Sequence, residues 1–264
     1  MKRFILYNIC FLISTNALLA QAIHSKVSYL CTTKLAKGPV HDGLNTLYFT
    51  QDKGLFIHHN YPKEDAYLTK GNVMIFMQGD PEGLPVFMNL KEQFLYYKST
   101  YGLANGSFIL REDLPDIQWK ILSENKKIEQ FNCIKAVGDF GGRTYDVWFT
   151  PDIPVRLGPY KLWGLPGMIL EAKSKDGRVS YEFKSYESPI RDEVKIEKPN
   201  VGQEVSWEEY NAHIINKLLR TESLSNDQYR ATNNDPDPNY EIEYNKHTVI
   251  SEYKKQRATN QRRN

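Results

Sequence analysis

Few residues of this 264-residue chain stand at spacings that could do chemistry. His58 and His59 are adjacent in a segment with strand character, so their side chains point to opposite faces and cannot share a metal ion without distortion. Glu209 and His213 are four apart in a predicted helix and could touch, but two ligands do not make a metal site. The sequence contains no nucleophile elbow, phosphate loop, dinucleotide fingerprint or zinc-protease motif. It therefore predicts no catalytic residue, metal or cofactor.

Three residues are candidates for binding a ligand. Arg156 could hold a carboxylate or phosphate with two hydrogen bonds, or it could form a structural ion pair. Tyr160 and Trp163 lie near turns, and aromatic rings at the open side of a curved sheet suit an apolar or peptide-like ligand. The same rings could instead fill the core. The predicted ligand-binding residues are therefore Arg156, Tyr160 and Trp163.

These candidates lie in a run of proline and glycine whose role is structural. Proline restricts φ and lacks an N–H donor, whereas glycine reaches backbone angles closed to other residues. Such a run specifies a backbone path, and we expect Gly164 or Gly167 to hold a positive φ. The residues of this structural motif are Trp148, Pro151, Pro154, Gly158, Pro159, Gly164, Leu165, Pro166 and Gly167.

Residues 1–22 have the features of a secretory signal. Lys2 and Arg3 precede a short apolar run, and small residues end in Ala20-Gln21-Ala22, which predicts cleavage after Ala20 or Ala22. The apolar run is shorter than the roughly 20 residues of a membrane span. We therefore expect an exported protein, in the periplasm or cell envelope or secreted, that does not span the membrane after cleavage.

Charge argues against nucleic acid as a partner. The signal removes two of 34 basic residues and none of 32 acidic ones, so the mature chain has 32 of each. Phosphate binding needs a clustered basic excess. Two cysteines remain, Cys31 and Cys133, and in an exported chain they could form one disulfide or be buried separately as thiols.

Strand patterns dominate residues 23–228, which we interpret as a single β-rich domain followed by a polar, largely disordered tail over 229–264. Alternation of polar and apolar residues predicts an antiparallel meander, a strongly curved sheet or open half-barrel, with a helix over 206–219 packed on it. We expect turns at 123–127, 141–142 and 175–177, and a short edge strand at 240–244. The other expected strands are 27–33, 47–50, 55–58, 73–77, 84–90, 94–98, 107–111, 117–122, 128–137, 143–150, 168–174 and 178–186.

The segment 115–184 resembles the GLPGLI family of exported Bacteroidetes proteins. The naming motif stands here as Gly164-Leu165-Pro166-Gly167-Met168-Ile169, with methionine in place of one leucine. The resemblance extends to Trp119-Lys120-Ile121, to Cys133-Ile134-Lys135-Ala136, to Gly142, Arg143 and Tyr145, and to the runs 148–154 and 158–161. The family is functionally uncharacterised, so the resemblance implies an exported envelope protein and carries over no catalytic residue. The strand-rich pattern followed by a helix is also similar to the half-barrels of periplasmic lipoprotein carriers, which is an analogy of fold.

Three functions remain open. The favoured one is a non-enzymatic binding or carrier module that holds an apolar, lipid-like or peptide-like ligand on the concave face. The alternatives are an envelope hydrolase or processing enzyme, and an interaction module for an outer-membrane receptor or secretion system that uses an exposed sheet edge. A filled core with an exposed edge strand would favour the interaction module.

Overall fold

The structure is a computed structural model that describes residues 24–34, 40–59, 66–70, 73–77, 83–99, 107–191, 194–210 and 212–213. The predicted signal, the polar tail, the strand at 240–244 and the boundaries at 22 and 228 lie outside these residues. The described residues form fourteen strands: β1 (Ser25–Lys34), β2 (Val40–Phe49), β3 (Lys53–His58), β4 (Ala66–Lys70), β5 (Val73–Met77), β6 (Leu84–Asn89), β7 (Phe94–Ser99), β8 (Phe108–Asp113), β9 (Lys120–Ile128), β10 (Phe131–Phe140), β11 (Arg143–Thr150), β12 (Met168–Ser174), β13 (Val179–Glu187) and β14 (Gln203–Val205).

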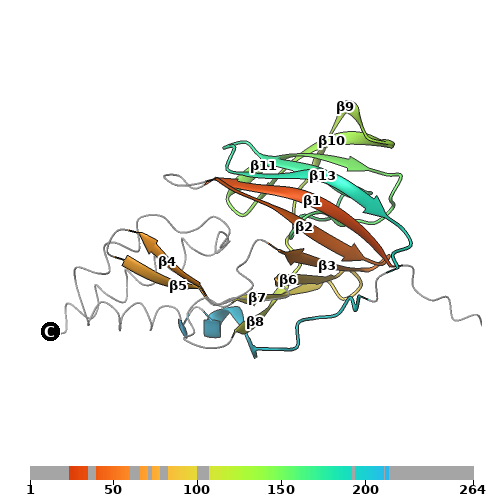
Figure 1. Cartoon of the computed structure of the whole chain (residues 1–264). Coiled ribbons are helices and arrows are strands. Elements are labelled where there is room, and N and C mark those ends of the chain that lie inside the picture. The colour runs from red at the N-terminus through yellow and green to blue at the C-terminus, as the bar shows by residue number, and fades with distance from the viewer. Residues whose placement is uncertain are drawn as a thin grey trace, which may run out of the picture.

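Twelve strands form one open, curved sheet in the order β14-β8-β7-β6-β3-β2-β1-β13-β12-β11-β10-β9, while β4 and β5 pair separately (Figure 1). The predicted mainly β fold with a curved antiparallel sheet is confirmed. The sheet consists of two local meanders, one of β1, β2, β3, β6, β7 and β8 and one of β9 to β13, and pairing of β1 with β13 joins them in the middle. One pairing departs from the expected pattern, because β14 runs parallel to β8.

The expectation that every neighbour in sequence pairs is wrong at several places. β3 pairs with β6, β4 and β5 pair with one another in a separate sheet, and β14 pairs with β8 instead of β13. The largest departure lies between β8 and β9. β8 and β9 follow one another in the chain but lie at opposite ends of the sheet order, with β8 inside β14 and β9 at the far edge. The connector between them, 114–119, must therefore span from one half of the sheet to the other. Long-range pairing of β1 with β13 produces this arrangement, and local turn signals carry no trace of it.

The turn expected at 123–127 is also wrong. These polar residues belong to β9, and the chain turns at Glu129 and Gln130, where Glu129 takes a positive φ of 49°. β9 is mostly exposed along its length, so its sequence lacks the alternation of a half-buried strand. The turns at 141–142 and 175–177 are confirmed, with positive φ at Gly141, Gly142 and Gly177.

The main core lies between the two halves of the sheet. It combines buried side chains of β1, β2, β3, β6 and β7 with those of β10 to β13 and of the Pro/Gly segment, our name for residues 151–167 between β11 and β12. A smaller cluster joins Leu55, Phe87, Tyr96, Ile109 and Ile196. The Pro/Gly segment therefore packs as part of the core.

A short helix follows β14 and packs beside β8, which confirms the predicted helix on the sheet. Ser206 caps it, because its hydroxyl accepts from the Glu209 amide at 3.1 Å and the Glu209 carboxylate accepts from the Ser206 amide at 2.8 Å. Tyr210 packs edge-on against Phe108. The described part of the helix ends at His213, so the rest of the predicted helix to 219 lies outside the described residues.

The two cysteines are separate buried thiols, so the disulfide alternative is wrong. Cys31 lies in β1 and Cys133 in β10, and β13, β12 and β11 stand between these strands in the sheet. A bridge needs Cα atoms within about 7 Å. Burial raises the pKa of Cys31 to about 12 and that of Cys133 to about 11, which keeps both thiols protonated and unreactive.

Candidate functional site

The Pro/Gly segment enters the core with strand-like alternation. Ile153, Val155 and Leu157 are buried, while Pro154 and Arg156 between them are exposed. Alternation with period two presents one apolar row to the core. This row fixes the path of the segment across the inside of the sheet.

Two glycines allow this path. Gly167 has φ 154°, and a Cβ atom there would stand 2.2 Å from the carbonyl oxygen of Thr150. Gly164 has φ 105°, with the Trp119 ring 3.6 Å from its Cβ position. The expected positive φ is confirmed at both positions, and Gly167 also requires the absence of a side chain.

Tyr160, a predicted ligand-binding residue, is buried against other rings. Its centroid lies 6.4 Å from that of Phe56 and 5.3 Å from that of His58. Its φ of 59° is unusual for a residue other than glycine, and such strain persists only when the surroundings impose it. Tyr160 therefore has a packing role in a backbone conformation that residues other than glycine rarely adopt.

The next residue, Lys161, is a buried cation with 6% relative exposure. Its Nζ lies 3.1 Å from a carboxylate oxygen of Glu112 and 3.8 Å from the centroid of the Tyr97 ring. The Tyr97 hydroxyl donates to the other oxygen of Glu112 at 3.0 Å. A buried charge needs a partner of this kind, so the contact ties the Pro/Gly segment to β7 and β8.

His58, at the end of β3, lies beside this ionic cluster of Lys161, Glu112 and Tyr97. Burial lowers the pKa of His58 to about 4, and the nearby charges of His59 and Lys161 act in the same direction. The Asn45 amide nitrogen lies 3.5 Å from Nδ1 of His58. At neutral pH His58 is therefore an uncharged ring packed beside Tyr160 and Phe56.

Trp163 and Arg156 also have partners within the chain. The Trp163 indole donates to the carbonyl of Pro115, and the Trp119 indole donates to the carbonyl of Trp163, both at 2.7 Å. Arg156 lies over the Trp163 ring and donates two hydrogen bonds to the carbonyl of Gly164. This reciprocal tryptophan clasp holds the connector 114–119 against the Pro/Gly segment.

The ionic cluster and the tryptophan clasp were not predicted from the sequence. Lys161, Glu112, Tyr97 and His58 come from four separated segments, so no spacing relates them. The available signal was a lysine inside an otherwise apolar run. The ligand-binding role of Arg156, Tyr160 and Trp163 stays a prediction, and the structure shows that each also has a packing role.

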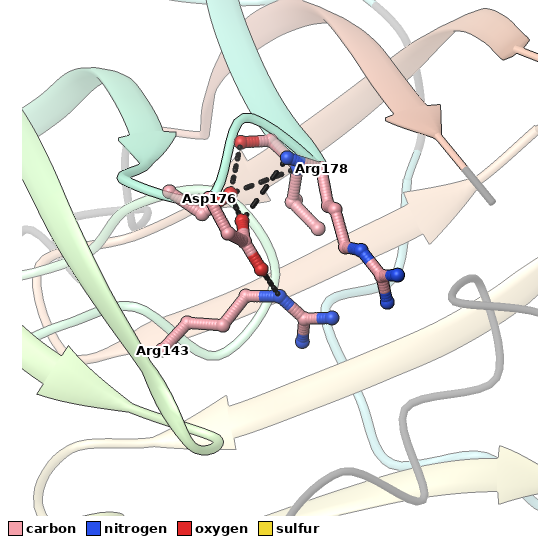
Figure 2. A network of polar contacts seen from close by, with 5 residues as sticks. Arg143, Asp176 and Arg178 are labelled. Carbon is pink, nitrogen blue, oxygen red and sulfur yellow. Dashed lines mark hydrogen bonds and ion pairs between the residues drawn. The ribbon is translucent and has the colours of Figure 1, made fainter. Parts of the chain in front are cut away.

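Two hairpin tips are joined by a second polar network (Figure 2). Arg143, at the β10–β11 tip, donates from Nε to the Asp176 carboxylate of the β12–β13 tip at 2.9 Å. The Ser174 hydroxyl and the Arg178 amide donate to the other oxygen of Asp176. Partial burial raises the pKa of Asp176, but these hydrogen bonds and the charge of Arg143 outweigh it and lower the pKa. The network stabilises the Asp-Gly turn.

The outer edge of β9 is the candidate binding surface. β9 ends the sheet order and pairs with β10 alone among the described strands (Figure 1). Side chains along it are mostly exposed, including Ile121 at 50%. β9 therefore presents a row of backbone groups away from β10. The row is irregular at 122–124, where the register with β10 shifts by two residues.

Charged side chains of β9 are paired across one face of the sheet. Lys126 contacts Glu171 and lies 4.6 Å from the Trp148 ring centroid, and Lys135 contacts Glu124 at 3.0 Å. Register places Lys135 opposite Trp148 and Trp148 opposite Glu171, so these side chains share a face. Glu124 and Lys126 therefore point to that same face.

The described residues carry neither a metal-ligand cluster nor a helix that could span a membrane. They contain no group of three His, Cys, Asp or Glu side chains that could hold a metal ion. None of their helices has the length and apolar character needed to cross a membrane.

Comparison with known proteins identifies a fold relative and a short family match. Residues 142–171 match the family described as "Protein of unknown function (Porph_ging)". Two structures of PNGF-II are similar: one in space group P21, with TM-score 0.53 and 19% identity over 74% of this chain and 34% of that chain, and one in C2, with TM-score 0.50 and 18% identity over 74% and 33%. This chain thus spans about a third of their length, and the similarity concerns the fold. No curated protein sequence matches.

Proposed function

We propose that this chain is a non-enzymatic binding module that receives an extended, peptide-like segment as an added strand along the outer edge of β9. The single observation that carries the proposal is the nine-residue terminal strand whose outer edge no described strand pairs with. Backbone hydrogen bonds to a free sheet edge are an established mode of peptide recognition.

The other hypotheses have weaker support. A carrier would need space on the inner face, where Ile153, Leu157 and Tyr160 of the Pro/Gly segment belong to the core. A hydrolase would use the ionic cluster, whose Lys161 and Tyr97 both bind Glu112. Location in the envelope, with an outer-membrane protein as partner, is part of the proposal.

Hairpin geometry identifies the backbone groups that an added strand would use. Ile128 and Phe131 flank a two-residue turn, so they exchange both hydrogen bonds. The Lys127 and Asn125 amides then point away from β10. Proline is tolerated where an edge-strand N–H faces solvent, so Lys127→Pro removes one binding donor and keeps the β9–β10 ladder.

The test uses dilute protein and a synthetic peptide of alternating valine and threonine, with a proline-interrupted peptide as control. We expect the alternating peptide to slow amide hydrogen exchange at Asn125 and Lys127 in the wild type. Lys127→Ala, which keeps the N–H, should behave like the wild type, and Lys127→Pro should lose the protection at Asn125. Equal protection in Lys127→Pro, or protection elsewhere with none on β9, would refute the proposal.

A further inference from the structure

We infer that the ionic cluster is part of a second binding site, which receives the carbonyl oxygen of an uncharged amide at Lys161 and the neighbouring His58. The site is built from β3, β7, β8 and the Pro/Gly segment, on the opposite half of the strand order from β9. It is therefore independent of the proposed binding surface on β9. Two hydrogen-bond donors that the chain leaves unfilled point to this ligand.

Lys161 has more donors than the protein uses. Its buried ammonium group carries three N–H donors, of which one donates to Glu112 at 3.1 Å. The face of the Tyr97 ring, whose centroid lies 3.8 Å from Nζ, can receive a second as a weak contact. Within the described part of the chain, no atom accepts the third. A buried N–H without an acceptor is costly, so this donor requires an acceptor from outside the chain.

His58 supplies another donor of the same kind. The Asn45 side-chain oxygen accepts from the His59 amide at 2.9 Å, which directs the Asn45 amide nitrogen toward Nδ1 of His58. Nδ1 is therefore the acceptor of the uncharged ring, and the proton lies on Nε2. None of the residues that the structure describes accepts a hydrogen bond from this Nε2–H.

The ring of Tyr160, a predicted ligand-binding residue, lies close to both donors. Its centroid is 5.3 Å from that of His58 and 5.4 Å from Nζ of Lys161. Tyr160 and Lys161 are buried, whereas His58, Tyr97 and Glu112 are partly exposed. A small ligand can therefore reach the two donors past these three partly exposed side chains.

Charge favours an uncharged ligand. Lys161 and Glu112 already neutralise one another, and a carboxylate or phosphate at Lys161 would also stand beside the Glu112 carboxylate. Like charges repel strongly where little water screens them. Since both unfilled groups are donors, the ligand atom must be an acceptor. A carbonyl oxygen has two lone pairs and matches both donors, whereas a hydroxyl brings a donor of its own.

The test titrates the purified protein with phenylpropionamide and, in parallel, with phenylpropionate, which carries a carboxylate in place of the amide. NMR follows the side-chain Cε signal of Lys161 and the ring nitrogen signals of His58. We expect saturable shifts at both residues with the amide, and an affinity about tenfold or more lower for the carboxylate. A site that holds only water gives no saturable shift at either residue, and that result overturns the inference. Equal or tighter binding of phenylpropionate overturns it as well.

A double variant tests the ammonium donor. Lys161→Met combined with Glu112→Gln removes this donor without leaving a carboxylate unpaired, so the shift of His58 with the amide should be lost. Lys184→Met combined with Glu182→Gln makes the same exchange at an exposed ion pair of β13 and should bind like the wild type. Unchanged binding in the first variant would contradict the site. Circular dichroism checks the folding of both, and the two probes on the wild type decide the matter alone if the first variant does not fold.

Discussion

The two edges of the large sheet end in opposite ways. At the edge formed by β8, which we call the capped edge, β14 adds a parallel strand and the following helix packs Tyr210 5.5 Å from the Phe108 ring. The Tyr210 hydroxyl and the Ser99 hydroxyl are 3.0 Å apart. At the open edge, β9 has no such addition among the described elements.

Composition of the edge strands explains the difference. β8 begins with Phe108, Ile109 and Leu110, all buried beneath the elements that cover them. β9 has lysine, glutamate, serine and asparagine along most of its length. An apolar edge strand must be covered by other elements for the protein to stay soluble. A polar edge strand can stay hydrated until another strand pairs with it. We therefore expect changes at the capped edge to affect stability and changes at the open edge to affect association.

The largest effect on stability should come from the Pro/Gly segment, which packs in the core against strands of both halves of the sheet. Gly167→Val places a Cβ 2.2 Å from the Thr150 carbonyl oxygen, so we expect a loss of about 4 kcal/mol or more in the free energy of unfolding. Urea denaturation measures it. Gly142→Val is the matched control, since Gly142 has φ 73° but nothing within 4 Å of its Cβ position. Equal losses in both variants would show that backbone strain, rather than close approach, decides the effect.

Acid should act on the half of the sheet next to the capped edge. His58 has a pKa near 4 in the folded protein and about 6.5 when unfolded, so the unfolded chain binds the proton first as pH falls. Stability from this group is complete above pH 6.5 and declines by up to about 3 kcal/mol as pH falls to 4. His58→Gln should flatten this part of the stability-pH curve. An unchanged slope would place the acid sensitivity elsewhere.

The tryptophan clasp tests the connector that leads from the capped edge to the open edge. Trp119→Phe removes the donor to the Trp163 carbonyl and should cost about 2 kcal/mol. Thermal unfolding followed by fluorescence measures it. Trp148→Phe is the control, because the Trp148 ring contacts Lys126 and Lys135 through its face. A smaller loss for Trp119→Phe than for Trp148→Phe would contradict a clasp.

The smallest effects contrast the edges directly. Tyr210→Phe removes the hydroxyl that bonds Ser99 and should cost about 1 kcal/mol. Lys127→Ala on the open edge should change unfolding free energy by less than about 0.5 kcal/mol. Parallel urea titrations compare the two. A larger loss at Lys127 would mean that the open edge also has a stabilising role.

Local sequence signals predicted the glycine-containing turns at 141–142 and 175–177 well, and the pairing of strands poorly. Gly141-Gly142 and Asp176-Gly177 sit where their backbone preferences require a turn, and each turn forms there. The turn expected at 123–127 was wrong because the prediction rested only on the polar composition of these residues. β9 is mostly exposed, so it lacks the alternation of polar and apolar residues that would have marked it as a strand. Pairing of β1 with β13 joins segments far apart in sequence, which no window of neighbouring residues reports.

Among the candidate functional residues, too, the sequence indicated those whose role depends on local backbone conformation and missed those that the fold brings together. The glycines of the Pro/Gly segment were identifiable because a backbone conformation depends on residue type. Lys161, Glu112 and His58 were not, because their meeting depends on the fold. An exposed sheet edge was predicted as one possible binding surface. Which strand forms that edge became known only from the strand order, which places β9 there.

Pairing of β1 with β13 has a consequence for how the chain is made. The strands of the first meander, β1, β2, β3, β6, β7 and β8, can pair while synthesis continues, but β1 then stands as a bare edge until Val179–Glu187 emerges. Local hairpins form early and the long-range pairing of β1 with β13 forms late, since closing the longer loop costs more entropy. The nascent chain therefore exposes its aggregation-prone surface at what becomes the centre of the finished sheet, so its folding should depend most on whatever shields β1 during that interval.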